Sequence, residues 1–389
     1  MDILLLSANR ERTPYPVFPL GLAFLAGPLA AAGHSLRSLD LCFVEDPEAE
    51  IREILSLFAP GVIIISIRNI DNVSHPGARS YLAGVKEVVS LCRGAAPIIL
   101  GGSGFSLMPV ELLSHLGGDY GIVGEGETVV TSLVAALSTG ASTASLPGVL
   151  AKGDSCYIQA EPIEAIGRPE RNLFQVERYF REGGMANLQT KRGCPFSCIY
   201  CTYPILEGRR VRLRPIPDVI AEIKELVGKY AVDYIYFVDD IFNFPLEYAE
   251  ELCRAMIASA LKVNWTAFIN PQFMTSGLFL AMIEAGCDAF EFGTDSGSPV
   301  MLKNLGKSFG VEEIRSVSML CREHGVDFAH YILFGGPGET EQTVMESFAL
   351  MDELAPVAVI GMTGIRIYPG TPLHRRALEE GVITAATDL

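Results

Sequence analysis

The chain has 389 residues, enough for about two or three domains of ordinary size. Hydrophobic residues make up 49% and charged residues 20%, a composition that excludes wholesale disorder. The formal net charge of −16 disfavours binding to a nucleic-acid backbone, because an acidic surface repels phosphate groups. We therefore expect no nucleic-acid partner.

The apolar stretches are too short for a membrane span. The best of them, residues 21–33, contains Pro28 and falls short of the about 20 apolar residues that a span needs. The first residues also lack the basic and apolar regions of a secretory signal. Nine cysteines, an odd number, then indicate a reducing compartment, so we expect a cytoplasmic chain without a membrane span.

Residues 2–137 alternate between short apolar runs and helical patterns. The expected strands are residues 2–7, 34–42, 61–68, 96–104 and 119–127, and the expected helices are residues 19–33, 51–60, 80–94, 110–118 and 128–137. Runs such as VIIIS at 62–66 are apolar without alternation, as a sheet covered on both faces requires. The regular order of strand and helix predicts a doubly wound, Rossmann-like parallel sheet with right-handed crossovers.

Ligands of such a sheet bind beyond the carboxyl ends of the strands. The small and polar residues expected at that edge are Ser66, Arg68, Asn69, Gly101, Gly102, Ser103, Gly124, Glu125 and Gly126. Glycines at two successive strand ends allow a ligand to approach the backbone, although tight strand-to-helix turns would also explain them. The chain lacks G-x-G-x-x-G and G-x-x-x-x-G-K-[ST], so a nicotinamide or nucleoside triphosphate site is not supported.

A boundary follows the first domain. Residues 138–150 are rich in Ser, Thr, Gly and Ala, and the pattern at 149–159 predicts a small hairpin around Gly153 and Asp154. We expect a first domain at residues 1–137, a linker with this hairpin at 138–184, and a second domain at 185–389.

Three cysteines form the sharpest motif of the sequence. Cys194, Cys198 and Cys201 follow the spacing C-x-x-x-C-x-x-C. Three thiolates this close can hold one iron–sulfur cubane and leave its fourth iron open to another ligand. A zinc site is the competing interpretation, but it needs a fourth ligand at zinc-finger spacing, and the next cysteine is Cys253. The other cysteines lie singly in apolar runs, which favours burial.

The cysteine spacing, with the aromatic Tyr200 just before the last cysteine, resembles that of the radical S-adenosylmethionine superfamily. In that family the open iron of a 4Fe-4S cluster chelates S-adenosylmethionine, and reduction by a donor such as flavodoxin or ferredoxin yields a 5′-deoxyadenosyl radical. The resemblance implies a partial, TIM-like (β/α)6 barrel. Strand candidates for it stand at residues 185–190, 234–240, 263–270, 287–295, 326–336 and 357–369.

The resemblance also implies contacts with S-adenosylmethionine at the strand ends. Asp239 or Asp240 stands where many members have a Gly-Gly-Glu run that holds the amino group, although a helix N-cap is an equal alternative. Thr294 and Ser296 would contact the ribose and the carboxylate. Gly335, in the segment FGGPGET, would pack beside the adenine.

Two further residues complete this set of candidates. Arg366, at the end of the expected sixth strand, would point into the cavity. His330 lies within the expected fifth strand, and a histidine there is more typical of a core than of an acid or base. The sequence identifies no catalytic residue beyond the candidates Asp239 and His330.

A doubly wound domain ahead of such a barrel resembles the cobalamin-binding class of the superfamily. The segments that carry this resemblance are residues 19–34, 100–109 and 119–127, and the polar and glycine residues at the sheet edge would then bind cobalamin. Domains that replace the lower ligand of cobalt carry D-x-H-x-x-G after the first strand. The corresponding loop at residues 8–21 has no histidine, so we expect no protein histidine ligand to cobalt.

The resemblance implies a cobalamin-dependent radical S-adenosylmethionine enzyme that methylates an unactivated carbon. Phe268, Phe290 and Phe334 near strand ends suggest a small-molecule or lipid-like substrate, but such residues also suit a core. Cyclisation, oxidation or rearrangement without methyl transfer is the enzymatic alternative, and a cofactor-binding sensor is the non-enzymatic one. Methylthio transfer to RNA normally needs a second cluster in the first domain, where only Cys42 and Cys92 lie.

Overall fold

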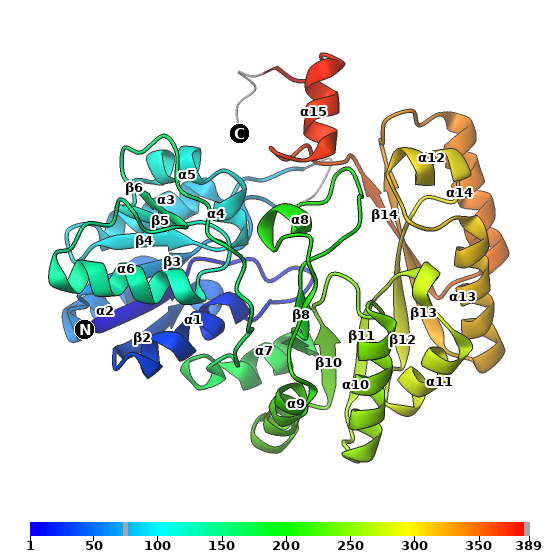
Figure 1. The fold of residues 1–389 in the computed structure, drawn as a ribbon, viewed down its shortest axis with the longest axis horizontal. Coiled ribbons are helices and arrows are strands. Elements are labelled where there is room, and N and C mark those ends of the chain that lie inside the picture. The colour runs from blue at the N-terminus through cyan, green and yellow to red at the C-terminus, as the bar shows by residue number, and fades with distance from the viewer. Residues whose placement is uncertain (73–76, 385–389) are drawn as a thin grey trace. The chain divides into compact units, whose positions relative to one another are not determined.

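The computed structural model describes residues 1–72 and 77–384, which form two compact units (Figure 1). The first unit comprises residues 1–72 and 77–184, and the second begins at Met185. Within the described ranges, none of the helices combines the length and the apolar character that crossing a bilayer demands.

The first unit is built on a six-stranded sheet. Its strands are β1 (Asp2–Ser7), β2 (Ser35–Asp40), β3 (Val62–Ser66), β4 (Ile98–Gly101), β5 (Tyr120–Ile122) and β6 (Val149–Ala151). The spatial order is β2-β1-β3-β4-β5-β6, and all pairs except β5 with β6 are parallel. The predicted doubly wound sheet is therefore confirmed, and its order reverses at β1 and β3, where ligands of this architecture bind.

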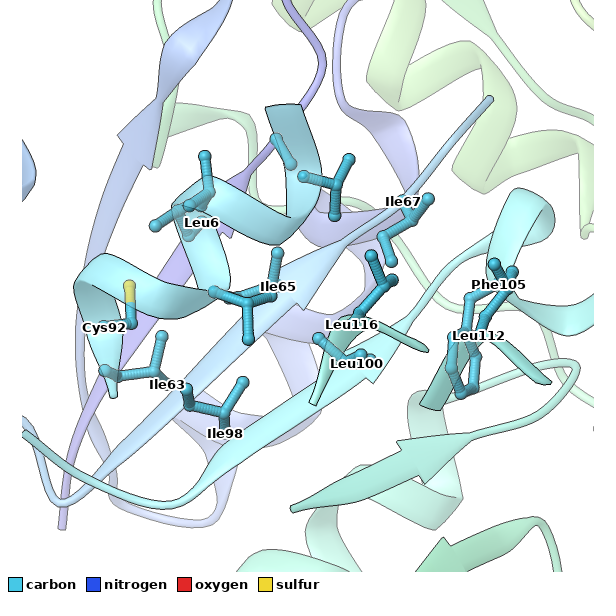
Figure 2. Packing of buried hydrophobic residues seen from close by; sticks show 14 of the residues in the cluster. Leu6, Ile63, Ile65, Ile67, Cys92, Ile98, Leu100, Phe105, Leu112 and Leu116 are labelled. Atoms are coloured by element: carbon cyan, nitrogen blue, oxygen red, sulfur yellow. The ribbon is translucent and has the colours of Figure 1, made fainter. Parts of the chain in front are cut away.

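Helices cover both faces of this sheet. They are α1 (Leu20–Ala31), α2 (Pro47–Phe58), α3 (Leu82–Cys92), α4 (Ser103–Leu107), α5 (Pro109–Leu116), α6 (Glu127–Thr139) and α7 (Val176–Gly183), with short 3-10 turns η1 (Leu41–Phe43) and η2 (Arg171–Leu173). Figure 2 shows Leu6, Ile65 and Leu100 of three strands, which belong to one buried cluster with Leu112 of α5. Burial of such apolar strands on both sides stabilises the sheet.

The expected hairpin at residues 149–159 does not form. Strand β6 pairs antiparallel with β5, where Ile122 lies opposite Val149, and residues 155–159 contain no strand. A short parallel sheet ends on β5 with unpaired backbone groups, and β6 satisfies them. The chain does turn after β6, since the Asp154 amide donates to the Ala151 carbonyl oxygen and the Gly148 amide donates to that of Ile158, but the strand partner of β6 is β5.

The second unit contains a second six-stranded sheet. Its strands are β7 (Ala186–Leu188), β10 (Tyr234–Phe237), β11 (Asn264–Ile269), β12 (Ala289–Asp295), β13 (Asp327–Phe334) and β14 (Ala358–Thr363). They are parallel and lie in chain order. This arrangement confirms the predicted partial (β/α)6 barrel.

The helices of the second unit follow the strands. They are α8 (Tyr203–Leu206), α9 (Ile216–Tyr230), α10 (Leu246–Ala258), α11 (Ser276–Glu284), α12 (Pro299–Asn304), α13 (Val311–His324), α14 (Glu341–Leu354) and α15 (Pro372–Glu379), with the 3-10 turn η3 (Pro271–Phe273). Side-chain caps start several of them: Thr275 accepts a hydrogen bond from the Leu278 amide at 3.1 Å, which fixes where α11 begins. Figure 1 shows α10 to α14 running beside the strands.

The two faces of this sheet differ in burial. Phe237, Ile269, Phe292 and His330 are fully buried, and each alternates along its strand with a half-buried residue. The half-buried residues of the four central strands include Tyr236, Phe268, Glu291 and Tyr331. Because neighbouring side chains of a strand point to opposite faces, these four share the face opposite the buried core, which we call the open face.

Candidate functional site

The three cysteines lie in a loop that follows a short antiparallel hairpin. Strand β8 (Lys191–Arg192) pairs with β9 (Arg212–Leu213) and delivers the chain into residues 193–202. Gly193 has a φ of +92°, and a Cβ there would lie 2.2 Å from the carbonyl oxygen of Arg210. Only glycine fits this position, so the residue before Cys194 sets the direction of the loop.

The thiols of this loop are close enough to affect one another. Burial raises the pKa of Cys194 to about 11 and that of Cys201 to about 12, and the Cys198 thiol adds to both shifts. Without bound iron the thiols are therefore protonated, and binding of a cluster must displace their protons. Across the described residues, no group of three His, Cys, Asp or Glu side chains has the geometry that would hold a single metal ion.

The Asp239 carboxylate is occupied by hydrogen bonds and an ion pair within the protein. Its carboxylate accepts hydrogen bonds from the Thr190 amide at 2.7 Å and the Lys191 amide at 3.2 Å, and it lies 3.1 Å from the Lys191 ammonium. The Lys191 and Asp239 side chains are 5% and 0% exposed. Asp239 thus ties the end of β10 to the start of the cysteine loop, which does not fit its expected contact with an amino group or a catalytic role.

Asp240 differs from its neighbour. Its Oδ2 is buried and has no hydrogen-bond partner in the described structure. Burial raises the pKa of this carboxyl well above its usual range, and the charges of Glu207 and Asp239 raise it further. A small cavity beside it is lined by Lys191, Arg192, Gly193, Cys194, Pro195, Phe196, Val211, Asp240, Ile241 and Phe244. Of the two acids, Asp240 is the one that faces the cysteine loop with an unused oxygen.

Tyr200 anchors the cysteine loop to strand β12. Its hydroxyl donates a hydrogen bond to Asp295, and the Lys307 ammonium lies 2.7 Å from the same carboxylate. Asp295 has a φ of +64°, a conformation that an L residue adopts at a cost of about 1 kcal/mol or more. Burial raises the pKa of the Cys198 thiol, and the Lys307 charge opposes that shift. The network therefore places a cation next to the thiols of the cysteine loop.

Thr294 and Ser296 are committed to protein partners. The Thr294 hydroxyl lies 2.6 Å from Nδ1 of His330, and the Ser296 hydroxyl lies 3.1 Å from that of Ser347 on α14. Both residues are at most 1% exposed. They face the helices, so the geometry does not support the contacts with ribose and carboxylate that the sequence suggested.

His330 is a core histidine. It is 0% exposed, and its Nε2 lies 3.1 Å from the hydroxyl of Ser318 while Nδ1 bonds to Thr294. Burial lowers its pKa to about 4. A neutral imidazole with both nitrogens engaged cannot exchange protons with a substrate, so its candidacy as catalytic acid or base is not supported.

The last two strand ends carry Gly335 and Arg366. Gly335 has a φ of +96°, and its amide donates to Glu339, while a Cβ there would lie 3.4 Å from Cα of Gly364. The two loops after β13 and β14 therefore pass close to each other. Arg366 is half-buried and donates to the hydroxyl of Tyr368 at 2.5 Å.

In the first unit, the ends of β3 and β4 are joined through backbone groups. The Ser103 hydroxyl donates to the Arg68 carbonyl oxygen at 3.0 Å, and the Gly104 amide donates to Ile67 at 3.0 Å. A Cβ on Gly102 would lie 2.6 Å from the Ile67 carbonyl oxygen. This glycine is needed for close packing of the two loops, as the tight-turn interpretation predicted.

The remaining candidates of the first unit lie along the same edge. Ser66 and Gly101 are paired in register at the ends of β3 and β4, and the Arg68 side chain beyond them is exposed and bonds with Asn69 when the Asn69 amide is oriented to satisfy both groups. At the end of β5, the Gly124 amide donates to the Ser106 hydroxyl at 2.9 Å. Glu125 accepts from the Ile163 amide at 2.8 Å, and a Cβ on Gly126 would touch Leu25 at 2.9 Å.

Several residues of the site escaped the sequence reading. Sequence pattern does not point to Lys191 or Lys307, because surface lysines are common and neither residue stands in a motif. Glu291 carried a usable signal, since it is a charged residue between two phenylalanines in an apolar strand. Strict alternation there places the acid on the opposite face from the core.

Two protein-family models match the chain. The model described as B12 binding domain matches residues 7–134, and the model described as Radical SAM superfamily matches residues 188–351. The first match falls within the first unit and the second within the second unit.

Similar proteins agree with both matches. The chain is 26% identical to the tryptophan 2-C-methyltransferase of Streptomyces laurentii, over 96% of this chain and 74% of that protein. It is 25% identical to an anaerobic magnesium-protoporphyrin IX monomethyl ester cyclase of Rubrivivax gelatinosus, over 87% of this chain and 62% of the cyclase.

Among solved structures, the radical S-adenosylmethionine methyltransferase TsrM of Kitasatospora setae is similar over nearly the whole chain. Its complex with tryptophan and a S-adenosylmethionine analogue has a TM-score of 0.91 and 26% identity, covering 100% of this chain and 79% of TsrM. A second structure of TsrM, with cobalamin and a [4Fe-4S] cluster, has a TM-score of 0.89, covering 99% of this chain and 76% of TsrM.

Proposed function

This chain belongs to the cobalamin-binding class of the radical S-adenosylmethionine superfamily, and from that premise we propose that it methylates an unactivated carbon of a small organic substrate. It is a cobalamin-dependent radical S-adenosylmethionine enzyme with a 4Fe-4S cluster. When bound, the cluster and S-adenosylmethionine supply a carbon radical, and cobalamin supplies the methyl group. The protein supplies positioning and exclusion of water.

The observation that carries the proposal is the cysteine loop of the second unit. It holds three mutually close thiols, and the unpartnered oxygen of Asp240 lines the same cavity as Cys194. This chemistry suits a cluster that binds an amino acid portion: the thiolates hold the iron, and a carboxylate accepts a hydrogen bond from an ammonium group. We assign Cys194, Cys198 and Cys201 to the cluster and Asp240 to the S-adenosylmethionine amino group.

The cation beside the loop has a positioning role in this proposal. Lys307 and Asp295 hold Tyr200, which stands between the second and third cluster cysteines. Three anionic thiolates repel one another, and a buried ammonium offsets part of that repulsion. Gly335 and Arg366, at the ends of the next strands, remain candidates for the adenosine portion.

The first unit would bind cobalamin at the carboxyl edge of its sheet. Arg68 follows β3, where the strand order reverses, and Ser103 follows the neighbouring β4, while Gly102 lets the two loops pack closely. Residues 8–19, which follow β1, include no histidine. We therefore propose that cobalt has no histidine ligand from this loop.

Ring formation without methyl transfer is the second candidate function. It is favoured by one observation, the 25% identity to the Rubrivivax gelatinosus cyclase over 87% of this chain. The methyltransferase proposal is preferred because the Streptomyces laurentii and TsrM matches cover larger shares of both partners.

The two candidates differ in the fate of the methyl group of S-adenosylmethionine. The test begins with anaerobic reconstitution of the full chain with iron, sulfide and hydroxocobalamin. The reconstituted protein is then reduced and incubated with methyl-deuterated S-adenosylmethionine, and the products are identified by mass spectrometry. We expect S-adenosylhomocysteine stoichiometric with bound cobalamin, and none from protein reconstituted without cobalamin. We also expect 5′-deoxyadenosine, which disappears in Cys198→Ala.

The alternative results are distinct. Formation of 5′-deoxyadenosine without any S-adenosylhomocysteine would contradict methyl transfer and favour cyclisation or rearrangement. S-adenosylhomocysteine that forms equally without cobalamin would contradict the role assigned to the first unit.

A further inference from the structure

Glu291 is a carboxylate in the middle of an otherwise apolar strand. It lies on β12 between Phe290 and Phe292, which are both 0% exposed, whereas Glu291 itself is half-buried. The side chain therefore belongs to the open face of the sheet and not to the core behind it. Neither the cysteine loop nor its Asp240 and Lys307 neighbours use this acid.

Two tyrosines hold the carboxylate through a single oxygen. The hydroxyl of Tyr236 on β10 donates to Oε2 at 3.1 Å, and the hydroxyl of Tyr331 on β13 donates to the same Oε2 at 3.0 Å. Within the described structure, Oε1 receives no hydrogen bond. The carboxylate is thus fixed in orientation while one of its oxygens stays unused.

Aromatic rings surround this acid. The ring of Phe268 on β11 lies 5.1 Å from that of Tyr331 and 6.2 Å from that of Tyr236, measured between centroids. Phe268 is also the partner of Glu291 in the parallel register. The three rings come from three different strands, so the fold itself brings these aromatic side chains together on the open face.

Glu291 has no cationic partner among the described residues. No Lys or Arg of the described residues forms an ion pair with Glu291. Burial raises the pKa of Glu291, while the hydrogen bonds from Tyr331 and Tyr236 oppose that shift. A partly buried carboxylate without a cation is costly, and a cationic ligand would remove the cost.

A carboxylate among aromatic faces is a typical arrangement for recognition of an ammonium group. The negative faces of the rings attract a cation, and the free oxygen accepts its N–H. An anionic ligand would be repelled by Glu291, and a purely apolar one would leave Oε1 desolvated and unpaired. We propose that Glu291, held by Tyr236 and Tyr331 beside Phe268, binds a protonated amino group of the substrate.

The site is placed to anchor a substrate near the cysteine loop. Asp295, which bonds to Tyr200 of that loop, stands four residues after Glu291 on the same strand, or about 13 Å farther along it. A small amine held at Glu291 can therefore extend along the open face toward the cysteine end of the barrel. The inference rests on the proposed function only in taking the bound amine to be the substrate.

Measurements of ligand binding test this proposal without requiring catalytic turnover. The full-length enzyme, reconstituted with cluster and cobalamin, is titrated at neutral pH with 2-phenylethylamine and with 2-phenylethanol, its neutral analogue. We expect the amine to bind about tenfold tighter than the alcohol, because only the ammonium group forms a charge-assisted hydrogen bond with the carboxylate. In Glu291→Gln the amine should lose about tenfold in affinity, while the alcohol keeps its affinity.

The matched control is Glu284→Gln, which removes an exposed carboxylate on α11 and should change neither affinity. Unchanged alcohol binding and an unchanged cluster spectrum show that Glu291→Gln is folded. Equal affinities of the amine and the alcohol for the unaltered enzyme would overturn the proposal, as would a Gln variant that keeps the preference. Loss of S-adenosylhomocysteine formation with intact amine binding would instead count against the proposed function alone.

Discussion

The two sheets of this chain end differently at their carboxyl edges. In the first unit, loop groups bond to one another, as Ser103 does with the Arg68 carbonyl oxygen and Gly124 with Ser106. In the second unit, Asp240, which follows β10, keeps an unused oxygen at this edge, and Glu291 keeps one farther back, in the middle of β12. Both edges belong to parallel sheets, so the fold alone does not cause the difference.

The difference suggests two ways to build a binding edge. A ligand that lies against backbone, as a large flat cofactor does, needs glycines and a fixed loop shape more than any single side chain. Ligands that are charged need specific side chains whose atoms are left free for them. Single substitutions of polar side chains should therefore weaken ligand binding strongly in the second unit and only slightly in the first.

The largest effect should come from the cluster ligands. We expect Cys198→Ala to lose almost all cluster iron and the visible absorption of the cluster, because two thiolates do not retain a cubane. Iron analysis and absorption spectra after reconstitution measure this. Cys156→Ala, which removes an exposed cysteine of the first unit, serves as the control and should retain its cluster. A Cys198→Ala protein with normal iron content would contradict the assignment of Cys198 as a cluster ligand.

Adjacent Asp239 and Asp240 provide the next test. Asp239→Asn removes one partner of a buried ion pair and should lower the free energy of unfolding by about 3–5 kcal/mol. Asp240→Asn removes an unpaired buried carboxyl and should leave stability unchanged or raised, but weaken S-adenosylmethionine binding. Urea unfolding of the apo-protein and titration of the reconstituted enzyme separate these outcomes. Equal destabilisation by both changes would contradict the distinction between the two acids.

In the first unit the sensitive positions should be glycines. Gly102→Ala should destabilise the protein by about 3 kcal/mol, because φ is +103° and the new Cβ would meet the Ile67 carbonyl oxygen at 2.6 Å. Gly33→Ala, at a φ of +79° with nothing within 4 Å of its Cβ, should cost only about 1 kcal/mol. Urea unfolding compares the two. Similar losses would mean that backbone strain alone, and not loop packing, makes Gly102 necessary.

The buried imidazole of His330 predicts a dependence of stability on pH. Its pKa is about 4 in the folded chain, below its usual value of 6.5, so the unfolded chain binds more protons between these values. Stability from this group is complete above pH 6.5 and falls as pH decreases, by about 2 kcal/mol at pH 5. His330→Gln should remove this part of the slope. A variant with the slope of the unaltered protein would show that other groups cause it.

Much of the fold could be predicted from sequence pattern. Runs such as residues 62–66 are continuous apolar strands that became β3, and the cysteine spacing pointed to the right superfamily. The hairpin expected at residues 149–159 is wrong because the strand partner of β6, the free edge of β5, lies outside the local sequence. Local pattern indicates which residues form a strand, but not which edge is vacant.

Side-chain direction at the site was harder to predict. Thr294 and Ser296 are polar residues near a strand end, but Thr294 keeps the alternation of Phe290 and Phe292 and lies on the buried face, where its hydroxyl meets His330. The pairing of β12 with β13 shifts register between Phe292 and Asp295, and Ser296 beyond the shift bonds to Ser347 on α14. Phe290 stacks on Phe279 in the core, whereas Phe268 lies on the open face. Alternation separates the two faces as far as Thr294, and it stops predicting the direction of a side chain only beyond the register shift.

The most direct measurement is the cofactor content of the full chain after anaerobic reconstitution, determined for iron and cobalamin together. The account predicts about four iron atoms and about one cobalamin per chain, with iron lost and the protein still folded in Cys198→Ala. A chain that retains the cluster but no cobalamin would contradict the proposed methyl transfer. A chain that binds about one iron or zinc atom instead would contradict the cluster itself.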